Sequence, residues 1–130
     1  MRDCEKPPQT ILLVDDEDAV RAFASLALRR AGFRVFEAGN GIEALRMCEH
    51  PQQRVDLLLS DIVMPGMDGW ELADDVRLLL PEVRVILMSG HAGELLSRSF
   101  DGYAFLAKPF TVQGLLKKVH EALCENGRAR

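Results

Sequence analysis

Five short apolar runs recur along the chain, with room for a helix between successive runs. Four of them are almost continuously apolar, which suits strands buried on both faces, as in a parallel sheet. The second run alternates more between apolar and polar residues. The five predicted strands are Thr10–Val14, Arg34–Ala38, Asp56–Ser60, Val83–Met88 and Tyr103–Ala107. A sheet of such strands needs covering layers on both of its faces.

The segments between the runs supply those layers, because their apolar residues follow the 3.6-residue period of amphipathic helices. The predicted helices are Glu17–Ala31, Gly41–His50, Gly69–Leu80, a short and weakly periodic Ala92–Ser99, and Thr111–Cys124. The expected apolar face of the first is Val20, Phe23, Ala24, Ala27, Leu28 and Ala31, and that of the third is Leu72, Val76 and Leu79. Regular alternation predicts an α/β fold, a five-stranded parallel sheet doubly wound as (βα)5 in a flavodoxin-like three-layer sandwich.

Length and composition limit the other possibilities. With 130 residues the chain has room for one domain, which we expect at residues 10–125, between flexible tails at 1–9 and 126–130. With a net charge of −4, the chain lacks the excess of basic residues that direct nucleic-acid binding requires. No apolar run approaches the roughly 20 residues that cross a membrane. Three cysteines without CxxC or Cys/His spacing argue against a disulfide framework and a zinc site, and they favour a reducing, cytoplasmic compartment.

Polar residues follow four of the five predicted strands. Asp15 and Asp16 follow the first strand, Asp61 the third, Ser89 the fourth and Lys108 the fifth. The carboxyl ends of parallel strands meet at one edge of the sheet, where ligands bind in such folds. Taken singly, each residue has an ordinary structural interpretation, such as a helix cap, a turn or a solvated lysine. Their conjunction at one edge instead predicts a functional site.

The chemistry of this set is that of phosphoryl transfer. Two carboxylates about 5 Å apart repel by roughly 3 kcal/mol at an effective dielectric constant of about 20, so three of them call for a cation. Mg²⁺ prefers such oxygen ligands and usually keeps room for waters or a phosphate. Asp61 is a better nucleophile than Ser89, because it is already ionised and needs no general base. Ser89 and Lys108 would then hydrogen-bond the phosphoryl oxygens.

With these residues in view, the chain resembles the receiver domains of two-component response regulators over about residues 10–124. The resemblance is carried by the four segments Ile11–Glu17, Ser60–Gly69, Met88–Gly90 and Lys108–Phe110. It implies that Asp61 is the phospho-acceptor and that Asp15, Asp16, Asp61 and the backbone carbonyl of Val63 hold Mg²⁺. It also implies that Lys108 binds the phosphoryl group, with a cis peptide before Pro109, and that Ser89 is the switch residue.

The resemblance further implies partners and a conformational switch. Phosphoryl transfer comes from a histidine kinase or a histidine phosphotransfer protein, and we expect the donor to dock beside helix Glu17–Ala31. Phosphorylation would draw in the loop after Ser89 and change the face formed by helix 92–99, the fifth strand and the last helix. That face would meet a downstream effector or a second copy of the chain in a homodimer. Phe105 stands where the family has a switch aromatic, and an ordinary strand residue is an equal interpretation.

Three other classes stay open at this point. An Asp-nucleophile phosphatase of the haloacid dehalogenase type would need Asp-x-Asp after its first strand, where this chain has adjacent Asp15 and Asp16. A flavodoxin-type binding module would need a Ser-, Thr- or Gly-rich phosphate loop there. A receiver that no longer takes phosphate and serves only for protein interaction or dimerisation would not need the complete set of polar residues.

Overall fold

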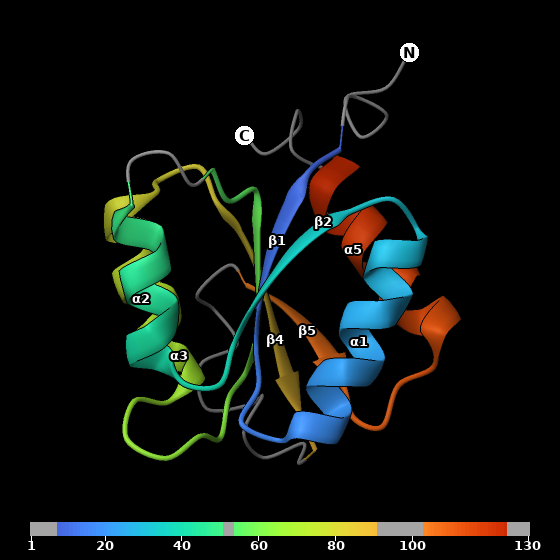
Figure 1. Cartoon of the computed structure of the whole chain (residues 1–130), viewed down its shortest axis with the longest axis horizontal. Coiled ribbons are helices and arrows are strands. Elements are labelled where there is room, and N and C mark those ends of the chain that lie inside the picture. Colours follow the sequence, from blue (N-terminus) through green and yellow to red (C-terminus); the bar gives the residue numbers. More distant parts are fainter. Residues whose placement is uncertain (1–7, 51–53, 91–102, 125–130) are drawn as a thin grey trace.

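The computed structural model describes residues 8–50, 54–90 and 103–124. Five strands form one parallel sheet in the order β2-β1-β3-β4-β5 (Figure 1). They are β1 (Thr10–Val14), β2 (Arg34–Ala38), β3 (Leu57–Asp61), β4 (Arg84–Ser89) and β5 (Ala104–Ala107). The helices of the described residues are α1 (Asp18–Arg30), α2 (Gly41–Glu49), α3 (Gly69–Leu79) and α5 (Val112–Cys124). The predicted doubly wound α/β fold is confirmed.

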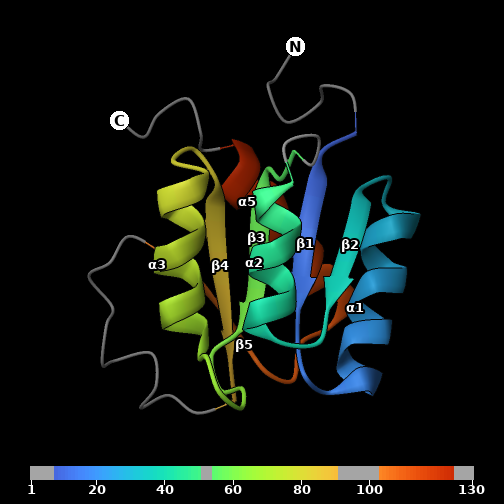
Figure 2. The ribbon, with the colours of Figure 1, turned by 60° about the vertical axis from the view of Figure 1, so that its left-hand side comes forward.

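Two helical layers cover the sheet, with α2 and α3 on one face and α1 and α5 on the other (Figures 1 and 2). Successive side chains of a strand point to opposite faces. In β1, Leu12 and Val14 therefore pack under α2 and α3, whereas Ile11 and Leu13 pack under α1 and α5. All four side chains are fully buried, which is why this run of the sequence is apolar without alternation. The central strands are thereby fixed from both sides.

The structure corrects three of the sequence expectations for packing and boundaries. Phe23 and Ala31 are exposed, whereas Ala24, Ala27 and Leu28 form the core face of α1 and Ala31 is its C-cap residue. Leu79 is also exposed, since it closes the last turn of α3. Strand β3 runs one residue beyond the predicted end and includes Asp61, which pairs with Met88 of β4.

Some expectations fall on residues that the structure does not describe. The predicted helix 92–99 and the tails 1–9 and 126–130, apart from residues 8 and 9, lie outside the described ranges. Among the described cysteines, Cys48 is a buried free thiol whose pKa is raised by burial to about 11. Cys124 is disulfide-bonded, so the expectation that the cysteines form no disulfide was wrong for this residue. None of the described helices is long and apolar enough to cross a membrane.

Helix α3 begins tightly against the end of β3. Asp68 and Glu71 form a capping box, in which each side chain accepts a hydrogen bond from the backbone N–H of the other residue. The N–H of Gly69 donates to the carbonyl oxygen of Ile62 over 2.8 Å. A Cβ atom at Gly69 would overlap the carbonyl oxygen of Asp61 and lie 2.8 Å from the Cα of Ile62. Glycine is therefore required where the helix passes the end of the strand.

We expect Gly69→Ala to lower the free energy of unfolding by about 2 kcal/mol, as overpacking against backbone does. Urea denaturation followed by circular dichroism measures it. The matched control is Gly39→Ala, because the nearest atom to a Cβ there is 3.6 Å away, an ordinary van der Waals distance. Equal stability of the two variants would contradict the tight packing of α3 against β3.

Candidate functional site

The topology brings together the ends of β1, β3 and β5, which are far apart in the sequence. The ammonium of Lys108, just after β5, lies 3.0 Å from Oδ2 of Asp15 and 3.1 Å from Oδ2 of Asp61. A more exposed carboxylate, that of Glu17, lies 3.6 Å from the same nitrogen. Asp15 is fully buried and Asp61 nearly so. The predicted convergence of these residues at one sheet edge is confirmed.

The acidic residues of this edge form a compact cluster. Asp15, Asp16 and Asp61 each offer a carboxylate oxygen, and these oxygens all lie within 4.8 Å of one another. The cluster offers only hard oxygen donors, as Mg²⁺ prefers. The donor set therefore fits a hard divalent cation. Asp15, Asp16 and Asp61 are also the residues whose mutual repulsion such a cation would relieve.

The acidic run after β1 does not act as a helix cap. Glu17 occupies the N-cap position of α1, but its side chain makes no capping hydrogen bond. The carboxylate of Asp15 instead accepts hydrogen bonds from the Glu17 N–H, over 2.9 Å, and from Lys108. The interpretation of this run as a simple cap is thus not supported, and its first carboxylate is held toward the cluster.

The two charges at the centre of the site shift one another's protonation. Burial raises the pKa of the Asp61 carboxyl; Lys108 and a hydrogen bond from the Val63 N–H oppose this shift, and Asp15 adds to it. Burial by itself would lower the pKa of the Lys108 ammonium, but hydrogen bonds with Asp15 and Asp61 outweigh it and the pKa is raised. The ammonium therefore keeps its charge, while the ionised form of Asp61 is destabilised.

The remaining predicted residues lie around this centre. Ser89 is the buried last residue of β4, and its carbonyl oxygen accepts a hydrogen bond from the Lys108 N–H over 2.8 Å. Val63 follows β3 with an exposed side chain; its carbonyl as a metal ligand stays a prediction. The Lys108–Pro109 peptide is cis, as expected.

Phe105 takes part in an aromatic cluster that sequence reasoning missed. Its ring meets the ring of Trp70 edge-on, with centroids 5.7 Å apart, and Trp70 in turn lies 6.3 Å from the ring of Tyr103. The Tyr103 hydroxyl donates to Asp74 over 2.7 Å, and the guanidinium of Arg77 lies 5.4 Å above the tyrosine ring. The signal that could have found this cluster is the single Trp and single Tyr of the chain, although nothing in their spacing indicates contact.

Arg21 is a second residue that the sequence did not single out. It lies one turn into α1, and its Nη1 donates to the carbonyl oxygen of Asp15 over 2.6 Å. An arginine at a helical turn's distance after an acidic run is common on solvated helices, so spacing alone did not separate it from a surface residue. Only the fold brings it beside the acidic cluster.

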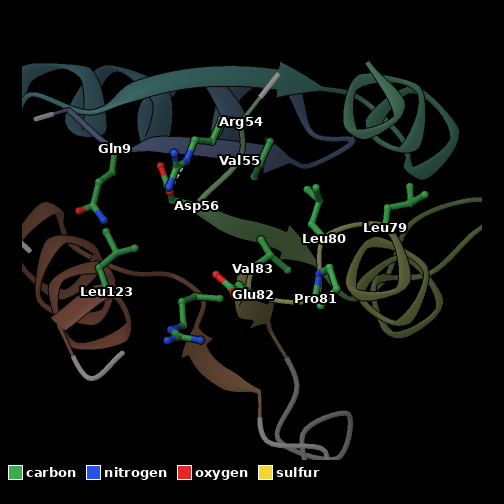
Figure 3. A pocket seen from close by; sticks show the side chains of 11 residues that line it. Gln9, Arg54, Val55, Asp56, Leu79, Leu80, Pro81, Glu82, Val83 and Leu123 are labelled. Atoms are coloured by element: carbon green, nitrogen blue, oxygen red, sulfur yellow. Dashed lines mark ion pairs between the residues drawn. The ribbon is translucent and has the colours of Figure 1, made fainter. Parts of the chain in front are cut away.

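A hollow of about 480 Å³ lies at the opposite end of the sheet, beside the amino ends of the strands (Figure 3). Its lining comes from residues that precede β1, β3 and β4, together with the end of α5. Arginine and acidic side chains both line it, including Arg54 and Asp56, whose nearest charged atoms are 3.6 Å apart. It is thus separate from the acidic cluster, which sits at the carboxyl ends of the strands.

Comparison with known proteins places this arrangement in a family. Residues 11–120 match the family model described as the response regulator receiver domain. Sporulation initiation phosphotransferase F of Bacillus subtilis is 32% identical over 119 residues, which are 88% of this chain and 94% of that protein. Sensor kinase CckA of Brucella abortus is 41% identical over 117 residues, which are 88% of this chain. The chain spans only 12% of the length of CckA.

Solved structures agree with these matches. The receiver domain of the hybrid histidine kinase CckA has a TM-score of 0.77 at 39% identity, covering 88% of this chain and 98% of that one. A CheY-like receiver domain protein from Methanospirillum hungatei has a TM-score of 0.84 at 30% identity, covering 95% of this chain and 99% of that one.

We expect Asp61→Asn to stabilise the metal-free protein at neutral pH. The folded-state pKa of Asp61 is raised, so the folded protein holds this proton more tightly than the unfolded chain does, and stability is lost as pH rises through that pKa. Asparagine does not ionise, so the advantage of the variant should be absent at strongly acidic pH, grow as pH rises from the unfolded-state pKa to the raised folded-state pKa, and stay constant above it. Urea titrations with a chelator present, across acidic to neutral pH, measure the difference. Glu121→Gln, at an exposed position of α5, serves as the control. A difference in stability between Asp61→Asn and the wild type that does not change with pH would contradict the expectation.

Proposed function

We propose that this chain, which belongs to the family of response regulator receiver domains of two-component systems, accepts a phosphoryl group on Asp61. The observation that carries the proposal is the position of the Asp61 carboxylate. It lies 3.1 Å from the Lys108 ammonium and within one acidic cluster with Asp15 and Asp16. A nucleophile, a cation that can bind phosphate and a candidate metal site thus share one edge of the sheet.

The proposed donor is a phosphohistidine of a histidine kinase or a histidine phosphotransfer protein. A carboxylate oxygen of Asp61 attacks phosphorus and forms an O–P bond, while the P–N bond to the histidine breaks. The electron pair of that bond stays on the imidazole nitrogen, which takes up a proton. The product is an acyl phosphate on Asp61 of this chain. Because the chain itself carries the product, it would catalyse only its own phosphorylation and dephosphorylation.

The other residues of the site support this step. Asp15, Asp16, Asp61 and the backbone carbonyl of Val63 would hold Mg²⁺, which would supply positive charge to a group that carries about two negative charges. Lys108 and Ser89 would donate hydrogen bonds to the phosphoryl oxygens. Ser89 ends β4, which pairs with β3, and the ammonium of Lys108, just after β5, lies 3.1 Å from Asp61. Charge-assisted bonds of this kind form only in the phosphorylated protein and can therefore drive a switch.

The switch we propose combines Ser89 and Phe105. Ser89 would move toward the phosphoryl group, and Phe105, which is half-buried against Trp70, would follow. The face expected from β5, α5 and the predicted helix at residues 92–99 would then meet a downstream effector or a second copy in a homodimer. Helix 92–99 lies outside the described residues.

The donor is proposed to dock on α1 beside the site. Phe23 is exposed there by 45% and packs against Phe110 of the loop after β5, with ring centroids 6.0 Å apart. Ala19, Val20 and Pro109 complete the apolar lining of a hollow of about 440 Å³ that also borders Lys108. An exposed apolar patch next to the reacting residue suits a helical partner that must bring its phosphohistidine to Asp61.

Two further expectations belong to this proposal. The receiver unit would span residues 10–125, flanked by the segments 1–9 and 126–130, and the family match over 11–120 supports these limits. The chain would work in the cytoplasm, without direct contact with nucleic acid or membrane.

Incubation with acetyl phosphate and Mg²⁺ should add one phosphoryl group to the full chain, read by intact-mass spectrometry. The gain should vanish in Asp61→Asn and when Mg²⁺ is replaced by a chelator. The exposed residue Glu49 of α2, which lies outside the acidic cluster, gives the matched control Glu49→Gln, which should be labelled like the wild type. A folded wild-type chain that gains no mass would instead favour a receiver that serves only for protein interaction.

Phe23→Ala should lower the rate of labelling by a phosphorylated histidine phosphotransfer domain about tenfold, as the loss of about 1.4 kcal/mol of docking energy would. Labelling by acetyl phosphate should not change, because this small donor needs no docking surface. The control is Leu78→Ala, since Leu78 is 81% exposed on α3, across the sheet from α1. Equal loss with both donors would argue against a docking role for Phe23.

A further inference from the structure

The side chain of Arg21 joins three segments of the chain beside the acidic cluster. Its Nη1 donates to the carbonyl oxygen of Asp15 over 2.6 Å, its Nη2 to Asp18 over 2.8 Å and its Nε to Glu37 of β2 over 3.3 Å. The side chain is only 19% exposed. Because a guanidinium is planar and presents its donors in a fixed fork, three acceptors hold it in one orientation.

The contact with Arg21 completes the restraint of Asp15. The N–H of Asp15 donates to the carbonyl of Ala38, and its two carboxylate oxygens accept from the Glu17 N–H and from Lys108. With the bond from Arg21 to the carbonyl oxygen, each polar group of Asp15 has a partner. The residue is thus fixed both at its side chain and along its backbone.

Asp16 has no such restraint of its own. It is exposed, and within the described part of the chain no hydrogen bond or ion pair holds its carboxylate. The peptide unit that joins Asp15 to Asp16 is planar, so a bond that fixes the carbonyl of Asp15 also fixes the Cα of Asp16. The position of the Asp16 carboxylate relative to Asp15 and Asp61 therefore depends on the contact between Arg21 and the carbonyl of Asp15.

We infer that Arg21 is a positioning residue for divalent-cation binding, which orients the Asp15–Asp16 peptide so that both carboxylates face the same site. This inference rests on the proposed Mg²⁺ site. Residues that orient metal ligands without touching the metal commonly change its affinity 10- to 100-fold (an order-of-magnitude range) when they are removed.

A purely electrostatic role for Arg21 predicts the opposite sign. A positive charge close to the cluster repels a divalent cation, so its removal would tighten Mg²⁺ binding if charge were its main contribution. Positioning predicts weaker binding. The direction of the change in affinity therefore separates the two roles.

Isothermal titration of the full chain with Mg²⁺ tests the inference. Arg21→Ala should bind Mg²⁺ about tenfold more weakly than the wild type. The matched control is Arg29→Ala, which removes the same charge from the same helix. Arg29 also reaches Glu37, over 3.5 Å, but its other contacts are with Ser25 and the carbonyl of Val35. The control should bind Mg²⁺ like the wild type.

Arg21→Lys keeps the test decisive if the alanine variant does not fold. Lysine retains the charge but lacks the planar fork, so its affinity for Mg²⁺ should still fall, by about threefold. Unchanged or tighter binding in a folded Arg21 variant, or an equal loss in Arg29→Ala, would overturn the inference. Failure of the wild type itself to bind Mg²⁺ or to be labelled by acetyl phosphate would instead overturn the proposed function.

Discussion

The site depends on a partly buried ammonium shared by two carboxylates. Lys108 comes from the end of the last strand, yet its Nζ lies about equally close to Asp15 and Asp61, at 3.0 and 3.1 Å. Removing water from charges is costly unless partners replace it. One positive charge among three carboxylates leaves the edge of the sheet negative, which suits a divalent cation. In the proposed function, the same ammonium would bind a phosphoryl group once a metal neutralised the carboxylates.

The sheet makes this arrangement rigid. Strands β1 and β3 are buried on both faces and lie side by side, so the residues at their carboxyl ends cannot drift apart without disturbing both cores. Gly69 adds a constraint from α3, which begins in contact with the backbone of Asp61 and Ile62. The Asp61 carboxylate, held by strand pairing, by a helix start and by an ion pair, has little freedom, as the proposed phosphoryl transfer would require.

Two side-chain networks lie beside the site. The aromatic cluster of Trp70, Tyr103 and Phe105 ties β5 to α3, and the bond from the Tyr103 hydroxyl to Asp74 fixes one end of it. Any movement of Phe105 must therefore change its contact with Trp70. On the other face, Arg21 links α1, β2 and the acidic loop. These two networks thus connect the site to helices on both faces of the sheet.

The sequence by itself determined the strands, the doubly wound architecture and the identity of the polar residues at the strand ends. Apolar runs and helical periods are local properties, and the rule that parallel strands end at one edge converts them into a site. Only the tertiary structure decided which apolar side chains are covered: Phe23 and Leu79 fit the helical period but lie at the margins of the packed layers. It also decided that Arg21 reaches the carbonyl of Asp15 and that Phe105 meets Trp70. Such contacts depend on side-chain direction across elements distant in sequence, which periodicity does not encode.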